Sequence, residues 1–143
     1  MIRKIFVDTD VILDLLQERS PFCNDSVKIF TLIEQGRIQG YVSPLIFSNL
    51  FYILRKYKDA GFAKSALLRL KLLLKIITVN EKIIGLALSS TFKDFEDAIQ
   101  YYSALEHNIP CLVTRNIKDY TGEDLFVLTP IDFLDIVMTS RKN

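Results

Sequence analysis

Residues 4–18 read KIFVDTDVILDLLQE and join two different patterns at a pair of aspartates. The first four residues of this stretch form a short apolar run, which is typical of a buried strand that ends at Asp8. Residues 10–18 then carry apolar side chains at helical spacing, and Asp10 is the candidate cap of that helix. The stretch therefore predicts a strand that passes directly into a helix, the basic unit of an α/β domain.

The same alternation continues to the end of the chain. Short β-type runs are expected at residues 4–7, 39–43, 76–79, 109–114 and 126–128. Helical patterns are expected at residues 10–18, 24–35, 44–58, 63–74, 81–90, 92–106 and from Pro130 onward. Strands that alternate with helices predict a three-layer α/β/α fold with a mostly parallel central sheet.

Length and composition favour one globular domain. The chain has 143 residues, half of them hydrophobic, with only five glycines and four prolines, which excludes a disordered or low-complexity chain. We expect a single domain over residues 1–139 and a frayed tail over residues 140–143. The net charge of only +1 excludes a strongly basic nucleic-acid clamp, but not a local basic patch.

Cysteine, histidine and hydropathy exclude further classes. Two cysteines in a chain of this length do not form a disulfide framework, and one histidine excludes a multi-histidine zinc site. No apolar run is long enough for a signal peptide or a membrane span. The expected location is the cytoplasm, with no membrane partner.

Carboxylates follow the predicted strands. Functional sites of parallel sheets lie at the carboxyl ends of the strands, where Asp8 follows the first strand and Asp119 follows the fourth. A helix cap and a turn residue are the structural alternatives for these two. Asp97 shares a helix face with Ala98 and Tyr101, so it points toward packed surface and needs a partner such as a divalent cation.

Further oxygen-bearing side chains lie close to these three in the sequence. Asp94 and Glu96 complement the helix dipole in the same first turn as Asp97, and Asn116 offers an amide oxygen before Asp119. Such side chains at one sheet edge suit Mg²⁺ or Mn²⁺, which can activate a bound water and stabilise charge on a phosphodiester. No glycine-rich nucleotide loop, CxxC or GxSxG motif offers a different chemistry.

Five blocks of the sequence, taken in order, resemble the PIN domain family. They are FVDTDVILDLL, SPLIFSNLFYILRK, DFEDAIQYYSALEHN, CLVTRNIKDY and LTPIDFL. The likeness covers nearly the whole chain and is greatest to small single-domain bacterial PIN proteins, among them the VapC-type toxins of toxin–antitoxin pairs. It implies a PIN-like fold and an endoribonuclease that depends on Mg²⁺ or Mn²⁺.

The resemblance also implies roles for individual residues. Asp8, Asp97 and Asp119 match the carboxylates that bind the metal in the family. Asn116 matches a further acidic or amide position of the catalytic site, and Thr114 matches a hydroxyl that often precedes it.

Three positions depart from the usual family pattern. Asp10 stands where Asn or Ser is usual, Asn49 stands where a metal-binding Glu is usual, and Asn116 replaces what is often Asp. Each amide removes a negative charge from the expected site. We hypothesise that Asp94 or Glu96 compensates from the neighbouring turn.

Basic residues offer candidate contacts to RNA. Seven Lys and Arg residues lie between Arg55 and Lys75 against the single acid Asp59, and they can follow a phosphate backbone or simply form solvated helix faces. Arg55 and Lys56 are candidates from this group. Arg115 is the sharper candidate, because it lies beside the proposed site in the sequence.

Protein partners are also expected. The helices predicted at residues 44–58 and 63–74 carry much of the apolar excess of the chain. This excess suggests a homodimer or a groove for a partner protein. The PIN resemblance implies that homodimers and antitoxin partners are both common.

Two alternatives remain open from the sequence. The amides Asn49 and Asn116 suit a PIN module without catalytic activity that binds RNA or a protein, and metal titration would separate this module from an enzyme. The pair Asp8 and Asp10 also has the spacing of phosphotransferases of the haloacid-dehalogenase type, in which an aspartate attacks phosphorus. However, Val11 and Ile12 stand where that type has Gly and Thr.

Overall fold

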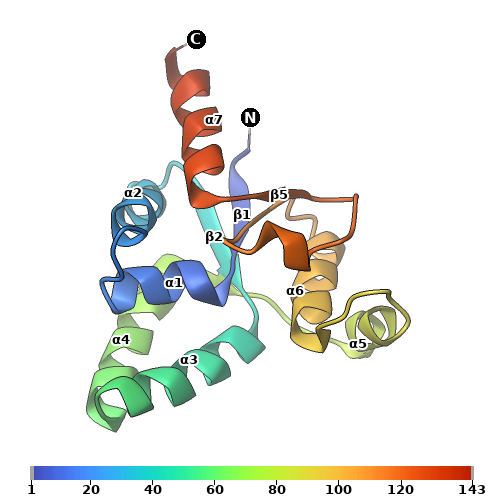
Figure 1. Ribbon diagram of the computed structural model, residues 1–143, viewed down its shortest axis with the longest axis horizontal. Coiled ribbons are helices and arrows are strands. Elements are labelled where there is room, and N and C mark those ends of the chain that lie inside the picture. Colours follow the sequence, from blue (N-terminus) through green and yellow to red (C-terminus); the bar gives the residue numbers. More distant parts are fainter. Residues whose placement is uncertain (1, 143) are drawn as a thin grey trace.

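The computed structural model describes residues 2–142, with side chains described as far as residue 139. Five parallel strands form one sheet in the order β3-β2-β1-β4-β5 (Figure 1). The strands are β1 (Lys4–Val7), β2 (Gln39–Val42), β3 (Leu74–Ile76), β4 (Cys111–Val113) and β5 (Phe126–Leu128). The sheet is parallel throughout, which confirms the predicted fold class.

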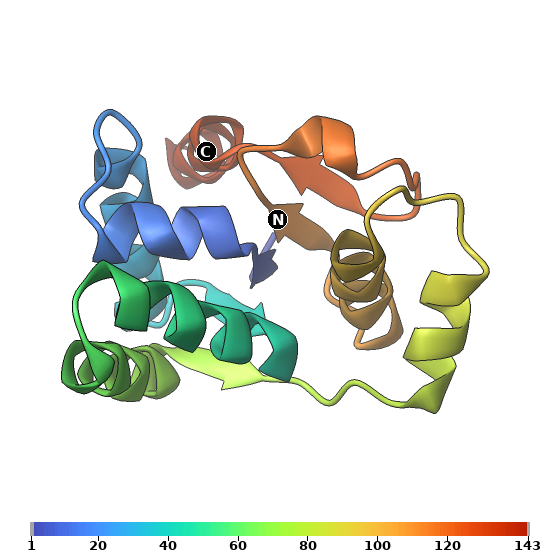
Figure 2. The same ribbon diagram turned by 60° about the horizontal axis from the view of Figure 1, so that its bottom comes forward.

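Within the described residues, seven α-helices and one short 3-10 helix connect these strands. They are α1 (Thr9–Leu16), α2 (Cys23–Glu34), α3 (Pro44–Tyr57), α4 (Ala60–Leu73), α5 (Glu81–Leu88), α6 (Phe95–Glu106), η1 (Ile117–Asp119) and α7 (Pro130–Lys142). Figures 1 and 2 place α1 to α4 together on one side of the sheet and α5 and α6 on the other. Helix α7 packs against α2.

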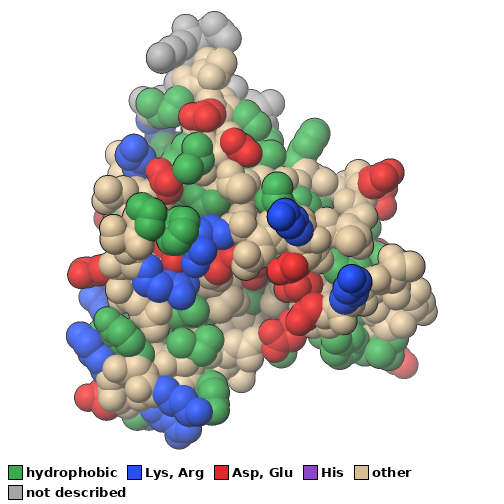
Figure 3. All heavy atoms as spheres, viewed as in Figure 1, with side chains coloured by type: hydrophobic (Ala, Val, Ile, Leu, Met, Phe, Trp, Pro, Cys, Tyr) green, Lys and Arg blue, Asp and Glu red, His purple; other side chains and the backbone are tan. Residues whose placement is uncertain are grey.

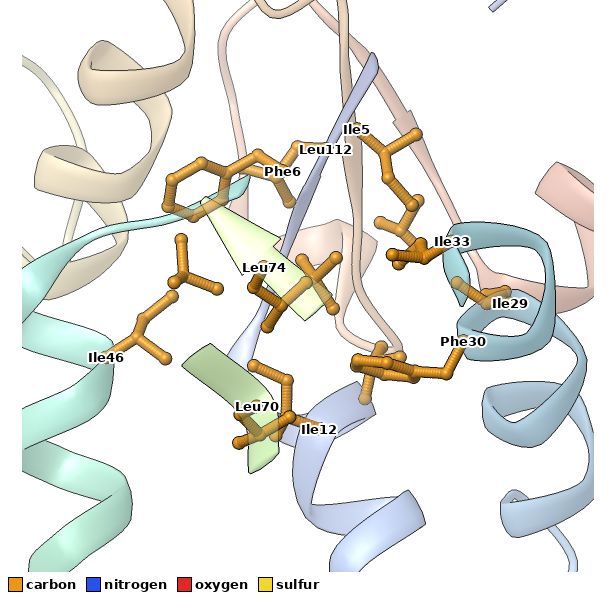
Figure 4. Close-up of a cluster of buried hydrophobic side chains, with 14 of the residues drawn as sticks. Ile5, Phe6, Ile12, Ile29, Phe30, Ile33, Ile46, Leu70, Leu74 and Leu112 are labelled. Atoms are coloured by element: carbon orange, nitrogen blue, oxygen red, sulfur yellow. The ribbon is translucent and has the colours of Figure 1, made fainter. Parts of the chain in front are cut away.

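The central strand β1 forms the middle of the core. Ile5, Phe6 and Val7 are all completely buried, because β1 pairs with β2 on one side and with β4 on the other. Successive side chains of a strand point to opposite faces, and Figure 4 shows Ile5 directed toward Ile29 and Ile33 of α2 while Phe6 points away from them. A strand covered on both faces has a continuous apolar sequence, as KIFV does.

The third strand differs from its prediction. The sequence pattern suggested residues 76–79, whereas β3 covers Leu74–Ile76 and starts directly where α4 ends. Leu74 pairs with Gly40 of β2, and a Cβ atom on Gly40 would lie only 2.6 Å from the side chain of Leu74. The missing side chain of Gly40 therefore leaves room for Leu74 in the sheet. The apolar spacing of the sequence had assigned Leu74 to the preceding helix.

Capping aspartates move the starts of three helices away from the predicted positions. Each accepts a hydrogen bond from a backbone N–H of the first turn, which has no partner within the helix itself. The capping residues are Asp8 before α1, Asp59 before α4 and Asp94 before α6. The expectation that Asp10 caps α1 was therefore wrong, because α1 begins one residue before Asp10.

The chain ends in α7, whose start matches the prediction. Pro130 is its first residue, as the sequence predicted, and Thr129 Oγ1 accepts a hydrogen bond from the Asp132 N–H at 3.1 Å. The backbone of residues 140–142 belongs to α7, while residue 143 and the side chains of residues 140–143 lie outside the described residues. The predicted frayed tail thus remains a prediction. In the described part of the chain, none of the helices has the length and apolar character needed to cross a membrane.

Candidate active site

Four aspartates come together at the carboxyl edge of the sheet. Asp8 follows β1, Asp10 lies in the first turn of α1, Asp97 lies in the first turn of α6 and Asp119 ends η1 after β4. Strands β1 and β4 are neighbours, and the Asp8 N–H donates to the carbonyl of Val113 at 3.0 Å. Figure 3 shows acidic side chains gathered beside α6 at the centre of this face, with Lys and Arg side chains over α1.

Asp8 is held by three hydrogen bonds. Its Oδ1 accepts from the Thr9 N–H at 2.7 Å, and its Oδ2 accepts from the Thr114 hydroxyl at 2.8 Å and the Tyr120 hydroxyl at 3.0 Å. Burial raises the pKa of Asp8, these hydrogen bonds oppose the rise, and the Asp119 carboxylate adds to it. Asp8 therefore both caps α1 and presents its second oxygen to the interior of the site.

Tyr120 bridges Asp8 and Asp97, a role that the sequence did not reveal. Its hydroxyl lies 3.0 Å from Asp8 Oδ2 and 3.4 Å from Asp97 Oδ1. The side chain is buried, and burial together with the nearby carboxylates raises the pKa of the Tyr120 hydroxyl, so it stays a neutral donor. An aromatic residue after a loop has the sequence signal of an ordinary core residue, which is why Tyr120 was missed.

Asp97 is half-buried, and its pKa is raised further than that of Asp10. Burial and the carboxylates of Asp94, Asp8 and Asp119 together raise its pKa to about 7, against the lowering effect of the Tyr120 hydroxyl. The prediction placed Asp97 on a packed face next to Ala98, and Ala98 is indeed buried. Repulsion among acids at one point favours a proton or a cation between them.

Asp10 ties the loop after β4 to α1. Its Oδ2 accepts from the Arg115 N–H at 3.1 Å, from Asn116 Nδ2 at 3.1 Å and from the Thr114 hydroxyl at 3.3 Å. Its Oδ1 is buried without a hydrogen-bond partner. Burial and the Asp8 carboxylate raise the pKa of Asp10 to about 6. Asn116 thus gives its amide N–H to Asp10 and retains its amide oxygen.

The remaining predicted acids lie at the junction of α3 and α6. Asn49 Nδ2 donates to Glu96 Oε1 at 2.9 Å. The amide that stands where the family usually has a metal-binding Glu therefore contacts a carboxylate of α6. Asp94 accepts from the Asp97 N–H at 3.0 Å and serves as the cap of α6. Asp94 therefore caps α6 instead of lying in its first turn, where the sequence placed it, and Glu96 is the carboxylate next to Asn49.

Basic residues predicted to contact RNA are divided between two places. Arg115 lies beside the carboxylates, but its guanidinium binds the completely buried Asp14, with Nε 2.6 Å from Oδ2 and NH2 3.1 Å from Oδ1. Arg55 and Lys56 lie in the last turn of α3, far along the helix from Asn49. Asp14 was not predicted, because an acid inside an amphipathic helix is normally solvated.

A small hollow opens next to Asp97 and Asp119. It has a volume of about 230 Å³, and its lining consists of Thr91, Lys93, Asp94, Asp97, Lys118, Asp119 and Thr121. Two lysines therefore flank two carboxylates of the cluster. This combination attracts both a cation and an anionic phosphate group.

The donor set can be compared with the needs of a hard divalent cation. In the part of the chain that the structure describes, no three His, Cys, Asp or Glu side chains are already placed to share one metal ion. The chemistry of the donors nevertheless fits Mg²⁺ or Mn²⁺, because all are oxygens, burial and their mutual repulsion raise the pKa of Asp97, and Asp10 Oδ1 has no partner.

The sequence matches a family model. The model of the PIN domain covers residues 4–118, most of the chain. The chain therefore belongs to the PIN domain family. This membership favours the PIN interpretation of Asp8 over the aspartyl phosphotransferase alternative.

Relatives and solved structures agree with this assignment. Ribonuclease VapC1 of Aquifex aeolicus (strain VF5) is 28% identical over 137 residues, which cover 92% of this chain and 94% of that protein. A toxin–antitoxin complex from Klebsiella pneumoniae is 25% identical with a TM-score of 0.66 and covers 88% of this chain and 97% of its own. VapBC2 from Rickettsia felis, bound to a promoter DNA fragment, has a TM-score of 0.66 at 18% identity over 88% and 98% of the chains.

Another similar fold comes from a toxin of Mycobacterium tuberculosis. VapC20, a toxin that cleaves the sarcin–ricin loop, has a TM-score of 0.60 at 16% identity and covers 76% of this chain and 86% of its own. At that identity the likeness concerns the fold.

Proposed function

We propose that the protein is a Mg²⁺- or Mn²⁺-dependent endoribonuclease that hydrolyses RNA phosphodiester bonds and acts as the toxin of a toxin–antitoxin pair. The observation that carries this proposal is the convergence of Asp8, Asp97 and Asp119 from three separate elements on one sheet edge, with Lys93 and Lys118 beside them. The full-length similarity to Ribonuclease VapC1 supports the same reaction.

The residues of the site divide into three groups with different roles in this reaction. Asp8, Asp97 and Asp119 would hold the cation, which supplies an activated water and charge stabilisation when bound. Thr114 and Tyr120 orient the Asp8 carboxylate through its Oδ2. Lys93 and Lys118 line the hollow beside Asp97 and Asp119, where they attract the phosphate backbone of the RNA.

Asp10 and Asn116 have a supporting role. Asp10 accepts hydrogen bonds from Arg115, Asn116 and Thr114 and so fixes the loop that carries Asp119. A fixed loop keeps the carboxylate of Asp119 within reach of the cluster, because small misplacements of catalytic groups are costly.

Glu96 supplies the charge that Asn49 lacks. The Asn49 amide donates to Glu96 at 2.9 Å, which orients a carboxylate at the place where the family usually has a glutamate on α3. Asp94 is the weaker candidate for this compensation, because its Oδ1 already caps α6.

Partners follow from the relatives and from the apolar surface. The similar Klebsiella and Rickettsia structures are toxin–antitoxin assemblies, and we infer that this chain binds an antitoxin and forms a homodimer in the cytoplasm. Leu68 and Leu72 of α4 are 66% and 87% exposed, and such apolar side chains favour a protein contact. Arg55 and Lys56 are proposed as outer contacts to RNA.

The decisive experiment measures RNA cleavage by the purified protein in Mn²⁺ and in EDTA. We expect cleavage of a mixed structured RNA in Mn²⁺, none in EDTA, and a loss of at least 100-fold in the Asp97→Asn variant, as is typical when a metal-ion site is lost. The matched control is Asp135→Asn, which removes an exposed acid of α7 and should retain full activity. Cleavage that survives EDTA or Asp97→Asn would contradict the proposal.

A PIN module without catalytic activity is the second candidate. The neutral Asn49 and Asn116 favour it, because they reduce the negative charge available to a cation. The two candidates differ in the effect of Mn²⁺ on thermal unfolding, since a ligand that binds only the folded state raises the melting temperature. A rise that disappears in Asp97→Asn supports the enzyme, and no rise supports the binding module.

A further inference from the structure

A second hollow lies directly beside the carboxylate site. Its volume is about 280 Å³, and its lining consists of Phe22, Asp25, Arg115, Thr129, Pro130 and Ile131. Arg115 belongs to both places, since its backbone N–H donates to Asp10 Oδ2 at 3.1 Å while its side chain borders the hollow. The preceding residue, Thr114, donates to Asp8 at 2.8 Å. A group bound in this hollow would therefore contact Arg115, the residue that directly follows Thr114 of the proposed reaction centre.

The guanidinium of Arg115 is held in place from behind. The buried carboxylate of Asp14 accepts from Arg115 Nε at 2.6 Å and NH2 at 3.1 Å, and Arg19 Nε lies 2.9 Å from the same carboxylate. Two cations on one anion leave excess positive charge at this place. A guanidinium has five N–H donors, two of these bind Asp14, and three remain available to a ligand.

The ring of Phe22 carries that guanidinium on its face. Its ring centroid lies 3.9 Å from Arg115 Cζ, and the side chain is 39% exposed. The outer face of an arginine guanidinium, like an aromatic ring, is a plane on which proteins stack unpaired bases of single-stranded RNA. Pro130 and Ile131 complete an apolar wall for the flat faces of a base.

Asp25 is the one acid of this lining and gives it a preference among bases. A carboxylate accepts two parallel hydrogen bonds from adjacent N–H groups, and guanine presents such a pair at N1 and N2. Guanine therefore fits Asp25 better than a base that lacks such a pair of N–H groups.

We propose that this hollow is a nucleobase subsite that binds a guanine of single-stranded RNA next to the phosphodiester to be cleaved. The base stacks on the Arg115 guanidinium, which Phe22 supports and Asp14 positions, and Asp25 accepts from the N–H groups of the base. The inference rests on the proposed ribonuclease function, whose substrate preference it specifies.

Binding to two matched RNAs in EDTA tests the subsite without cleavage. One fluorescent single-stranded heptamer carries a single guanosine, and the other carries inosine there, which lacks only the N2 amino group. We expect the wild-type chain to bind the guanosine heptamer about tenfold more tightly, as expected for one hydrogen bond to a charged group. Asp25→Asn should abolish this ratio, and Phe22→Leu should weaken binding of both heptamers about fivefold or more.

Controls separate the subsite from general charge effects and from the proposed function. Asp135→Asn removes an equal charge at an exposed position of α7 and should keep the guanosine-to-inosine ratio, and thermal unfolding checks that each variant is folded. Equal affinity for both heptamers, or a ratio that survives Asp25→Asn, would overturn the subsite, as expected if the hollow binds a protein side chain instead. RNA cleavage without discrimination refutes the subsite alone, whereas discrimination without cleavage refutes the ribonuclease alone.

Discussion

At the scale of single residues, Asp97 is the acid that the other carboxylates of the site repel. It lies in the first turn of α6, accepts a hydrogen bond from Tyr120 and faces the carboxylates of Asp8, Asp94 and Asp119. Such groups lower stability when ionised together and bind cations for the same reason. The cost to folding and the capacity for function thus have one physical origin.

The raised pKa of Asp97 predicts an unusual pH dependence of stability. Aspartate titrates near 3.9 in an unfolded chain, whereas burial and neighbouring acids raise the Asp97 pKa to about 7 in the folded state. Between these values the folded state keeps a proton that the unfolded state has released, so stability falls as pH rises. In EDTA we expect a higher melting temperature at pH 5 than at pH 7.5.

Asp97→Asn should reduce that difference, because the amide has no proton to lose. It should also raise the melting temperature at pH 7.5, while Asp135→Asn should leave the slope unchanged. Asp8 and Asp10 also have a raised pKa, so part of the slope should remain. A wild-type melting temperature that increases from pH 5 to pH 7.5 would refute this account of Asp97.

At the scale of elements, one buried acid joins three segments. Asp14 of α1 binds Arg19 from the connection to α2 and Arg115 from the loop after β4, and its side chain is completely buried. The same α1 carries Asp10, which accepts from the Arg115 N–H. Helix α1 therefore fixes the loop that leads to Asp119 by two independent contacts.

Asp14→Asn should be strongly destabilising. Removal of one partner from a buried ion pair typically costs about 3–5 kcal/mol, because the remaining charge stays buried without compensation. Both arginines are partly exposed, at 36% for Arg19 and 25% for Arg115, so we expect the lower end, about 3 kcal/mol, in the free energy of unfolding. Urea denaturation measures this, with Asp135→Asn as the control; a loss below about 1 kcal/mol would contradict the role of Asp14.

At the scale of the whole molecule, strand order joins the two halves of the chain. Strand β1 pairs with β2 from the first half and with β4 from the second. Its three buried side chains lie in one core cluster with residues as distant as Phe133 and Val137. Neither half can bury β1 alone, which supports a single domain over residues 1–139.

This arrangement predicts one cooperative unfolding transition. Far-UV circular dichroism reports the helices of both halves, and tyrosine fluorescence reports the six tyrosines, three in each half, of a chain without tryptophan. We expect the two signals to give the same urea midpoint, as in two-state unfolding. Separate midpoints would contradict a single cooperative transition.

The fold and the principal acids were accessible from the sequence. Periodicity alone located β1 and β5 at the observed residues, and the end of β1 pointed to Asp8. Asp97 emerged from its place on a packed helix face. These features depend on residues that are close together in the chain, and hydrophobic spacing reports such local order directly.

Other features depended on distant residues and were missed or misplaced. Leu74 joins the sheet because Gly40 leaves space in a neighbouring strand. Tyr120 and Asp14 have the sequence signals of a core residue and a solvated acid, yet each contacts residues more than 20 positions away.

The amino-acid sequence by itself determined the alternation of strands and helices, the parallel sheet and the acids that follow β1 and β4. Only the tertiary structure decided which hydroxyl holds Asp8, which carboxylate stands beside Asn49 and where Arg115 points. The physical reason is that local spacing controls which face of an element is apolar, whereas the partner of a buried polar group depends on what the other elements bring to it.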